Sequence, residues 1–466
     1  MRVLQRSVNT PTAEGARWAR VAAALATRLR ARLDTLFAAS AIERLVLGFS
    51  GGLDSTVLLH LLRDYVASRP LLLQACHVDH GLQDDSPRWV AHCARWATRF
   101  GVEFRSTRLS GTPPAGASIE DWARQQRYAS LLAQLDSRSV LITAHHLDDQ
   151  AETVLLQALR GAGPHGLAGV RASGYYGDRR LLRPLLDEPR RHLLAYGRSH
   201  ALEWIDDPSN VELRFARNRL RTVVMPVLER EFPGAAAALA RVATLQGEVV
   251  AVLDALADEF LHDSEVLDLT RLRGCAAPLR PFIIKRWLVR AGGPVPGRMQ
   301  LGHMLHDMLD ARDDAKPMVV WRGAAVRRYD DKFFFTAACL PTPSAAPLPC
   351  AVPWTPLCLA HGRLRAFEIT AGGADPAALA RGEISVRYRR GGERLRLHIG
   401  GPRRALKRLF QEWRVPPWLR DGWPLVFIGE HLALVPGQAV AAEFRAAGDG
   451  AGVAFEWRPR TSPGQD

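Results

Sequence analysis

The stretch SGGLDST, residues 50–56, carries residue types that suit a phosphate group. Its two adjacent glycines permit a tight turn with exposed backbone N–H groups, and a following helix would direct its positive end to the same point. Ser50, Ser55 and Thr56 add hydroxyl donors. Asp54 can hold a magnesium ion that neutralises phosphates. The turn lacks the GK[ST] ending with which kinases and GTPases grip the β- and γ-phosphates, so we expect a different use of the nucleotide.

A second group of reactive side chains lies in TAHHLDDQAET, residues 143–153. Asp149 and Glu152 are three positions apart, so on a helix they would share one face. Carboxylates in a first turn often only complement the helix dipole, but at the mouth of a nucleotide site they could hold magnesium or an ammonium group. His145 and His146 are either ordinary packed histidines or, for at least one of them, a general base or phosphate contact.

Arginines recur between and after these segments. EDWARQQRY places Arg124 and Arg127 three positions apart on a predicted helix, and RFARNRLR gathers Arg214, Arg217 and further arginines around Asn218. Taken singly, these would be charges on a solvated surface. Together with the two motifs above they form an ordered series along the chain.

Short apolar, strand-like runs alternate with helix-like runs between residue 44 and about residue 200. The strand-like runs are RLVLGF, LLLQACHV, VEFRSTRL and SVLITAHH, and segments with apolar residues at three- and four-residue spacing lie between them. This alternation predicts an α/β domain with a parallel, Rossmann-like sheet covered by helices on both faces. Ligands of such sheets bind at the carboxyl ends of the strands, where both motifs lie.

The composition changes near residue 223 to alanine- and leucine-rich helices, and changes again after a proline-rich linker at 340–350. We predict a partly helical N-terminal extension over 1–40, the α/β domain over 41–222 and a helical substrate- or tRNA-binding domain over 223–340. A small α+β domain that binds tRNA would follow over 351–466.

The formal net charge is +14 and the sequence pI is near 10.2, which favours a polyanionic partner. Residues 381–420 alone carry twelve Arg or Lys against three Glu, with Tyr388, Phe410, Trp413 and Trp418 interleaved. A solvated charged face is the alternative, but aromatic rings beside basic groups favour an RNA-contacting surface. We predict tRNA-binding residues at Arg403, Arg404, Lys407, Arg408 and Trp413.

Several classes of protein are disfavoured. No apolar stretch approaches the roughly 18 to 20 residues that cross a bilayer, so we expect no membrane protein. The arginine-rich start could suggest a transit peptide, but it lacks the apolar core and cleavage site of a secretory signal, and we expect a cytoplasmic protein. The six cysteines form no CxxC pair and no metal-ligand spacing, which indicates reduced thiols.

The SGGxDS turn resembles the pyrophosphatase loop of the N-type ATP pyrophosphatases, or PP-loop superfamily, whose members form adenylates and release pyrophosphate. Within that superfamily the chain resembles the tRNA(Ile)-lysidine synthase family over roughly residues 40–440. The motifs that carry the resemblance occur in the family's order: SGGLDS, HVDHGL, ARQQRY, AHHLDDQAET, RGAGPHGLAG, RPLL, DDPSN, RNRLR and LKRLFQEWRVPPW. Lys407 and Arg408 replace the family's frequent lysine pair, and the leader before residue 40 is longer than usual.

The resemblance implies a two-step reaction with ATP, magnesium, free L-lysine and an isoleucine tRNA with a CAU anticodon. ATP would adenylate the C2 oxygen of the wobble cytidine, and the ε-amine of lysine would then displace AMP to give lysidine.

The resemblance also implies roles for particular residues. The pyrophosphate portion of ATP, with magnesium on Asp54, would bind at Ser50, Gly51, Gly52, Leu53, Asp54 and Ser55. The lysine substrate would lie near Asp149 and Glu152. Catalytic roles fall to Asp54, to His146, which would take up a proton, and to Arg124 or Arg217, which would offset negative charge at the α-phosphate.

Two other functions remain open at this point. A tRNA thiolase of the same superfamily would need a cysteine persulfide or a cluster, usually with CxxC. A non-catalytic RNA-binding protein on a decayed nucleotide fold would not need Asp54, Asp149 and Glu152. The oligomeric state is not readable from the sequence.

Overall fold

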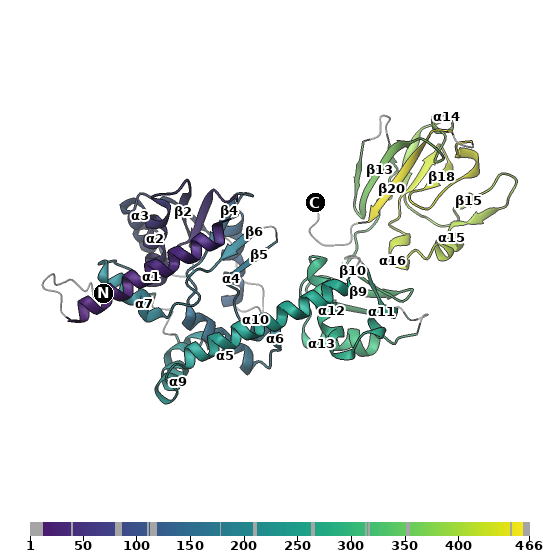
Figure 1. The fold of residues 1–466 in the computed structure, drawn as a ribbon. Coiled ribbons are helices and arrows are strands. Elements are labelled where there is room, and N and C mark those ends of the chain that lie inside the picture. The colour runs from purple at the N-terminus through teal and green to yellow at the C-terminus, as the bar shows by residue number, and fades with distance from the viewer. Residues whose placement is uncertain are drawn as a thin grey trace. The chain divides into compact units, whose positions relative to one another are not determined.

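The structure, a computed structural model, describes residues 13–38, 41–79, 86–109, 111, 119–177, 179–207, 212–261, 266–312, 315, 317–350, 355–447 and 450–459. The start of the predicted extension and parts of the motifs HVDHGL and DDPSN lie outside these residues. The chain forms two compact units, Met1–Val252 and Leu253–Asp466 (Figure 1). Each unit is described by itself.

A six-stranded sheet is the centre of the first unit. Its strands are β1 (Arg44–Gly48), β2 (Leu72–Asp79), β3 (Glu103–Arg108), β4 (Ser139–Ile142), β5 (Ser173–Tyr176) and β6 (Arg179–Leu182). They lie in the order β3-β2-β1-β4-β6-β5, and all neighbours are parallel except the antiparallel edge pair β5 and β6. The predicted parallel sheet is therefore confirmed. The strand order reverses between β1 and β4, the position where open α/β sheets bind ligands.

Helices cover both faces of this sheet. Helices α1 (Ala13–Phe37), α2 (Leu53–Val66), α3 (Ser86–Arg99) and α7 (Arg190–Ser199) pack on one face, and α4 (Ile119–Leu132) packs on the other. The unit also contains α5 (Leu147–Leu159), α6 (Pro164–Leu167), α8 (Ala216–Arg219), α9 (Met225–Glu231) and the start of α10 (Ala235–Phe260). In β1, Leu45 and Leu47 pack with α1, α2 and α7, whereas Val46 packs on the other face with α4. Successive side chains point to opposite faces because a strand has a two-residue period. The residues of this strand's run are apolar because both faces of the sheet are buried.

Helix α1 is part of the core of the first unit. Its Leu25, Leu29 and Leu33 are buried in the same apolar cluster as α2 and α7. Arg28 adds a bidentate pair with Glu188, with both N–O distances at 2.7 Å. The helical nature of this segment agrees with the sequence, while the domain boundary near residue 40 stays a prediction.

The second unit begins with a small sheet and three helices. These elements are β7 (Val266–Asp268), α11 (Leu269–Gly274), α12 (Arg280–Arg290), α13 (Arg298–His303), β8 (Met318–Trp321), β9 (Ala324–Tyr329) and β10 (Lys332–Ala337). The strands pair antiparallel in the order β7-β10-β9-β8, and Trp287 and Phe333 lie in the core between sheet and helices.

The rest of the second unit is mainly antiparallel β-structure. Its elements are β11 (Leu348–Pro349), β12 (Leu357–Leu359), β13 (Gly362–Ile369), α14 (Pro376–Leu379), β14 (Ile384–Arg387), β15 (Arg394–Arg396), β16 (Arg403–Ala405), α15 (Leu406–Glu412), α16 (Pro417–Arg420), β17 (Leu425–Ile428), β18 (His431–Val435), β19 (Ala439–Val440) and β20 (Gly452–Pro459). They form sheets of five, three and two strands. This agrees with the predicted α+β character.

Helix α10 corrects one expectation. It contains an 18-residue window with a mean hydropathy of 1.5, long and apolar enough by length and composition to cross a membrane. The many alanines and valines of this helix raise its mean hydropathy, but polar residues between them interrupt the apolar stretch. One such helix is weak support for a membrane span. Its carboxyl-terminal end carries Asp254 and Asp258, which pair with Arg286 of α12, so this end packs within the second unit.

Candidate active site

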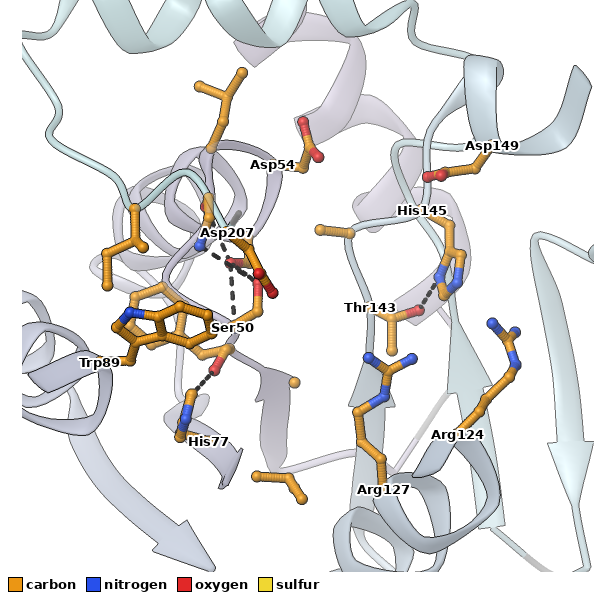
Figure 2. Close-up of a pocket in the computed structure, with 18 of the residues that line it drawn as sticks. Ser50, Asp54, His77, Trp89, Arg124, Arg127, Thr143, His145, Asp149 and Asp207 are labelled. Atoms are coloured by element: carbon orange, nitrogen blue, oxygen red, sulfur yellow. Dashed lines mark hydrogen bonds between the residues drawn. The ribbon is translucent and has the colours of Figure 1, made fainter. Parts of the chain in front are cut away.

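A cavity of about 540 Å³ opens at the carboxyl ends of the strands of the first unit (Figure 2). The turn after β1 and the loop after β4 form opposite walls, and helix α4 adds a third. The residues that line this cavity include Ser50, Gly52, Leu53, Asp54, Ser55, Arg124, Arg127, Tyr128, His145, Asp149, Arg190, Arg217 and Arg221. The two motifs found in the sequence therefore share one cavity.

The turn after β1 has the predicted geometry of an anion site. Gly51 has φ +79°, and a Cβ there would lie 2.8 Å from Sγ of Cys93, so both conformation and space require glycine. The hydroxyls of Ser50 and Ser55 lie 3.0 Å apart, and Ser55 donates to the carbonyl of Gly52 at 3.1 Å. Helix α2 begins at Leu53, so its N-terminal amides add donors at this wall.

His146 caps helix α5 and lies among three carboxylates. Its Nε2 is 3.6 Å from Asp54 Oδ2 and 3.4 Å from Asp149 Oδ2, and its Nδ1 is 3.6 Å from Asp148 Oδ2. Burial by itself would lower the pKa of His146, but these carboxylates raise it to about 10. His146 is 1% exposed, and its raised pKa favours the cationic ring, although Nδ1 also lies 3.4 Å from the backbone N of Asp149 as a helix-capping acceptor. A cationic ring is a poor proton acceptor, so the raised pKa argues against the proton-acceptor role expected for His146, which stays a prediction.

His145 points into the cavity instead (Figure 2). Its Nδ1 lies 2.9 Å from the hydroxyl of Thr143. Burial lowers the pKa of His145 to about 3, with Asp149 opposing and Arg183 adding to the shift. His145 is therefore a neutral hydrogen-bonding group that faces the cavity across the physiological pH range.

Asp149 and Glu152 are held by two arginines. Arg217 Nε donates to Glu152 at 2.9 Å, and its Nη2 lies 3.3 Å from Asp149 Oδ1. Arg221 donates to Glu152 at 2.7 and 3.0 Å and to Asp149 at 2.9 Å. Burial would raise the pKa of Asp149, but His146 and Arg217 hold it well below its usual range. An ammonium group could reach the carboxylate of Glu152 only after an arginine withdrew.

A widened helical turn carries one of these arginines. Residues Leu220–Val224 form a π-helical turn between α8 and α9, and Pro226 follows. Proline has no N–H to donate to the carbonyl four residues earlier, so a regular α-helix cannot run through this position. The wider turn contains Arg221, four residues after Arg217, which places both guanidinium groups on the carboxylates of α5.

Arg190 also lines the cavity, although no sequence motif indicated it. Its Nε lies 3.5 Å from Asp54 Oδ1, and its backbone N–H donates to Asp148 at 2.8 Å. The backbone is further fixed because Leu147 N–H donates to the carbonyl of Glu188 at 3.0 Å. An arginine in the first turn of a helix is unfavourable because its charge opposes the helix dipole. This unfavourable position, shortly after the RPLL motif, could have indicated from the sequence that Arg190 is a functional residue.

Arg124 lies in the cavity wall, and its catalytic role stays a prediction. It and Arg127 come from α4, and their guanidinium carbons lie 5.4 and 5.9 Å from the ring centre of Tyr128. Burial lowers the pKa of Arg127. Figure 2 shows both side chains on the same side of the cavity as His145.

One carboxylate could hold a metal. Among the described residues no cluster of three or more His, Cys, Asp or Glu forms a metal site. Asp54 Oδ1 is buried and accepts no hydrogen bond from any residue in the described ranges. Magnesium is usually bound by one or two carboxylates together with phosphate oxygens, so Asp54 fits such an ion.

The basic surface of the second unit is less aromatic than predicted. Arg403, Lys407 and Arg408 are exposed, and Arg404 pairs with Glu412. Trp413 is partly buried edge-on against Phe410, with ring centres 6.0 Å apart. Of the other interleaved rings, Phe410 and Tyr388 are buried, because they fill the core of this unit. The tRNA-binding role of the five predicted residues stays a prediction.

The fold and the turn after β1 define a PP-loop ATP-binding protein: residues 25–228 match the family model described as the PP-loop domain. Residues 267–334 match the TilS substrate binding domain, and residues 384–457 match the TilS substrate C-terminal domain. The chain belongs to the tRNA(Ile)-lysidine synthase family. This membership also accounts for the order of the motifs quoted above.

The family is supported by relatives that match along nearly their whole length. The tRNA(Ile)-lysidine synthase of Alkalilimnicola ehrlichii is 39% identical over 408 residues, which cover 85% of this chain and 90% of that protein. The enzyme of Methylococcus capsulatus is 38% identical over 422 residues, covering 88% and 95%. That of Legionella pneumophila (strain Paris) is 37% identical over 415 residues, covering 86% and 93%.

Proposed function

We propose that this protein joins lysine to C2 of the wobble cytidine of an isoleucine tRNA with a CAU anticodon, with conversion of ATP to AMP and pyrophosphate. The observation that carries the proposal is that the turn after β1 and Asp149 line one cavity, with Glu152 beside Asp149. Membership of the tRNA(Ile)-lysidine synthase family supports the same reaction.

In the first step the C2 oxygen of cytidine attacks the α-phosphorus of ATP, and the bond to the leaving pyrophosphate breaks. We infer that the amides of Gly51, Gly52 and Leu53 and the hydroxyls of Ser50 and Ser55 bind the pyrophosphate, which the turn geometry and the start of α2 support. Magnesium, when bound, would neutralise phosphate charge beside Asp54.

Arg190 supplies the positive charge that this turn lacks. In kinase and GTPase loops a lysine within the motif reaches the phosphates. Here the guanidinium group of Arg190 reaches the turn from helix α7, and its position beside Asp54 supports the same task. Arginine can bind phosphate through two parallel N–H bonds, which favours it at a site where pyrophosphate must be held as a leaving group.

In the second step the ε-ammonium group of lysine gives a proton to Asp149 or Glu152, the free amine attacks C2, and the bond from C2 to the oxygen of AMP breaks, so that AMP leaves. Asp149 and Glu152 offer anionic partners for the incoming ammonium group, while His146 positions Asp54 and Asp149. Lysine binding then displaces at least one arginine from these carboxylates. A displaced Arg217 could pair with the phosphate of the adenylate, which fits the charge-offsetting role predicted for it.

The thiolase alternative is disfavoured by its chemistry. Cys76 lines the cavity, and Cys93 lies behind the turn against Gly51. Burial raises the pKa of each thiol to about 12, so neither is a thiolate at neutral pH. Sulfur transfer needs a thiolate nucleophile. A non-catalytic RNA-binding role is disfavoured because the ionised carboxylates and the phosphate turn are present together.

The test is to incubate the protein with ATP, magnesium, labelled lysine and total tRNA. Label should enter one isoleucine tRNA, and Asp54→Ala should abolish labelling. If ATP is converted to AMP and pyrophosphate but no tRNA is labelled, the substrate assignment fails. If Asp54→Ala labels tRNA as well as the unchanged protein, the proposed active site is wrong.

A further inference from the structure

Two tyrosine rings lead from the cavity wall to the molecular surface. Tyr128 of α4 lines the cavity and is 7% exposed. Tyr176, on the edge strand β5, is 57% exposed, and its ring is nearly parallel to that of Tyr128, with an interplanar angle of 10° and centres 6.4 Å apart. The outer face of Tyr176 is therefore accessible next to a ring that lines the cavity.

Tyr176 contributes little to the core. The apolar cluster on this face of the sheet contains Tyr128, Leu131 and Leu181 but not Tyr176. Exposure alone does not distinguish Tyr176, because Tyr175 on the same strand is also exposed; the nearly parallel ring of Tyr128 does distinguish it.

The surroundings of the two rings are those of a nucleobase site. Arg124 and Arg127 lie against the ring of Tyr128, and Arg179 is the cross-strand neighbour of Tyr176. Aromatic rings that stack on bases, beside guanidinium groups that pair with phosphates, are the usual means of binding single-stranded RNA. The hydroxyl of Tyr128 is buried, and within the described ranges it has no hydrogen-bond partner. Such a group is costly to leave unpaired and suits a polar atom of a ligand.

We propose that Tyr128 and Tyr176 form a stacking platform for the RNA loop that delivers the target cytidine. The outer face of Tyr176 stacks on a base adjacent to that cytidine, and the hydroxyl of Tyr128 bonds to the RNA at the cavity wall. The platform rests on the proposed function, since it assumes that a cytidine in an RNA loop enters this cavity.

Tyr175 provides a matched control. It is the preceding residue on β5 and is 73% exposed, so it is at least as accessible as Tyr176. Successive side chains of a strand point to opposite faces, which directs Tyr175 away from α4. Replacing either Tyr175 or Tyr176 with alanine therefore removes an identical side chain, from one face or from the other face of the same strand.

The experiment uses the full chain and an anticodon stem-loop that carries 2-aminopurine next to the target cytidine. Stacking on Tyr176 should quench the fluorescence on binding. Tyr176→Ala should weaken binding roughly 5- to 150-fold and abolish the quenching, because a base–aromatic stack is lost. Tyr176→Trp should retain both. Tyr128→Phe, which keeps the ring, should weaken binding about fivefold through loss of one hydrogen bond.

Tyr175→Ala should leave affinity and quenching unchanged. If Tyr176→Ala binds and quenches like the unchanged protein, the platform is wrong while the proposed function stands. If the unchanged protein binds no stem-loop but still hydrolyses ATP, the proposed function fails and the platform with it.

Discussion

Arg221 holds Glu152 through two hydrogen bonds, from Nε to Oε1 at 2.7 Å and from Nη2 to Oε2 at 3.0 Å. The carboxylate is 1% exposed, and Arg217 adds a third bond at 2.9 Å. Burial of a carboxylate is unfavourable unless cations and hydrogen bonds compensate for the lost water. The two arginines thus compensate for the burial of Glu152, and they also occupy the place where a substrate ammonium group would bind.

Substitution of Arg221 should destabilise the first unit. Arg221→Met leaves Glu152 with Arg217 alone, and because Arg221 is itself partly exposed we expect a loss of about 1–3 kcal/mol. Urea unfolding measures this change. Arg219→Met, at an exposed position at the end of the preceding helix α8, should change stability by less than about 0.5 kcal/mol. Equal stability of the two variants would show that Glu152 does not depend on Arg221.

His146 should make stability depend on pH above neutrality. Its folded-state pKa of about 10 exceeds the ordinary value of about 6.5, so the folded protein holds this proton more tightly. The resulting stabilisation is complete below about pH 6.5 and is lost as the pH rises toward 10, with a slope of at most about 1.4 kcal/mol per pH unit. His146→Gln removes this contribution. The measurement is the difference in unfolding free energy between the two proteins at several pH values. A difference that does not change with pH would contradict a protonated His146.

The two glycines of the phosphate turn should tolerate alanine differently. Gly51→Ala places a Cβ at positive φ and 2.8 Å from Cys93 Sγ, and we expect a loss of about 1–3 kcal/mol together with a raised KM for ATP. At Gly52 the nearest atom is 3.6 Å away and φ is −78°, so Gly52→Ala should leave folding stability nearly unchanged. Thermal unfolding of both variants checks this. The double change Gly51→Ala with Cys93→Ala should recover only the steric part of the loss.

Arg190 should matter for pyrophosphate rather than for lysine. Loss of a charge-assisted hydrogen bond predicts that Arg190→Met weakens pyrophosphate binding roughly 10- to 100-fold, while Arg190→Lys keeps part of it. Calorimetric titration of the protein with magnesium pyrophosphate measures this without tRNA. The neighbouring exposed Arg191 gives the control, because Arg191→Met should bind pyrophosphate normally. If Arg190→Met binds pyrophosphate with unchanged affinity, Arg190 is not part of the phosphate site.

The sequence by itself determined the features that depend on neighbouring residues. Alternation of apolar runs predicted the parallel sheet, and SGGLDST and AHHLDDQAET each follow a strand, so their places at the carboxyl edge were readable. The requirement for glycine at position 51 was expected from a tight turn, although the contact with Cys93 was not.

Only the tertiary structure decided what depends on burial and on distant partners. The pairing of Arg221 with Glu152 joins residues 69 positions apart, and Arg190 reaches Asp54 from another helix. The protonation of His146 follows from three carboxylates that a linear pattern does not place around one ring. Phe410 is buried and Tyr176 is exposed because packing, rather than residue type, decides which aromatic rings remain available to a ligand.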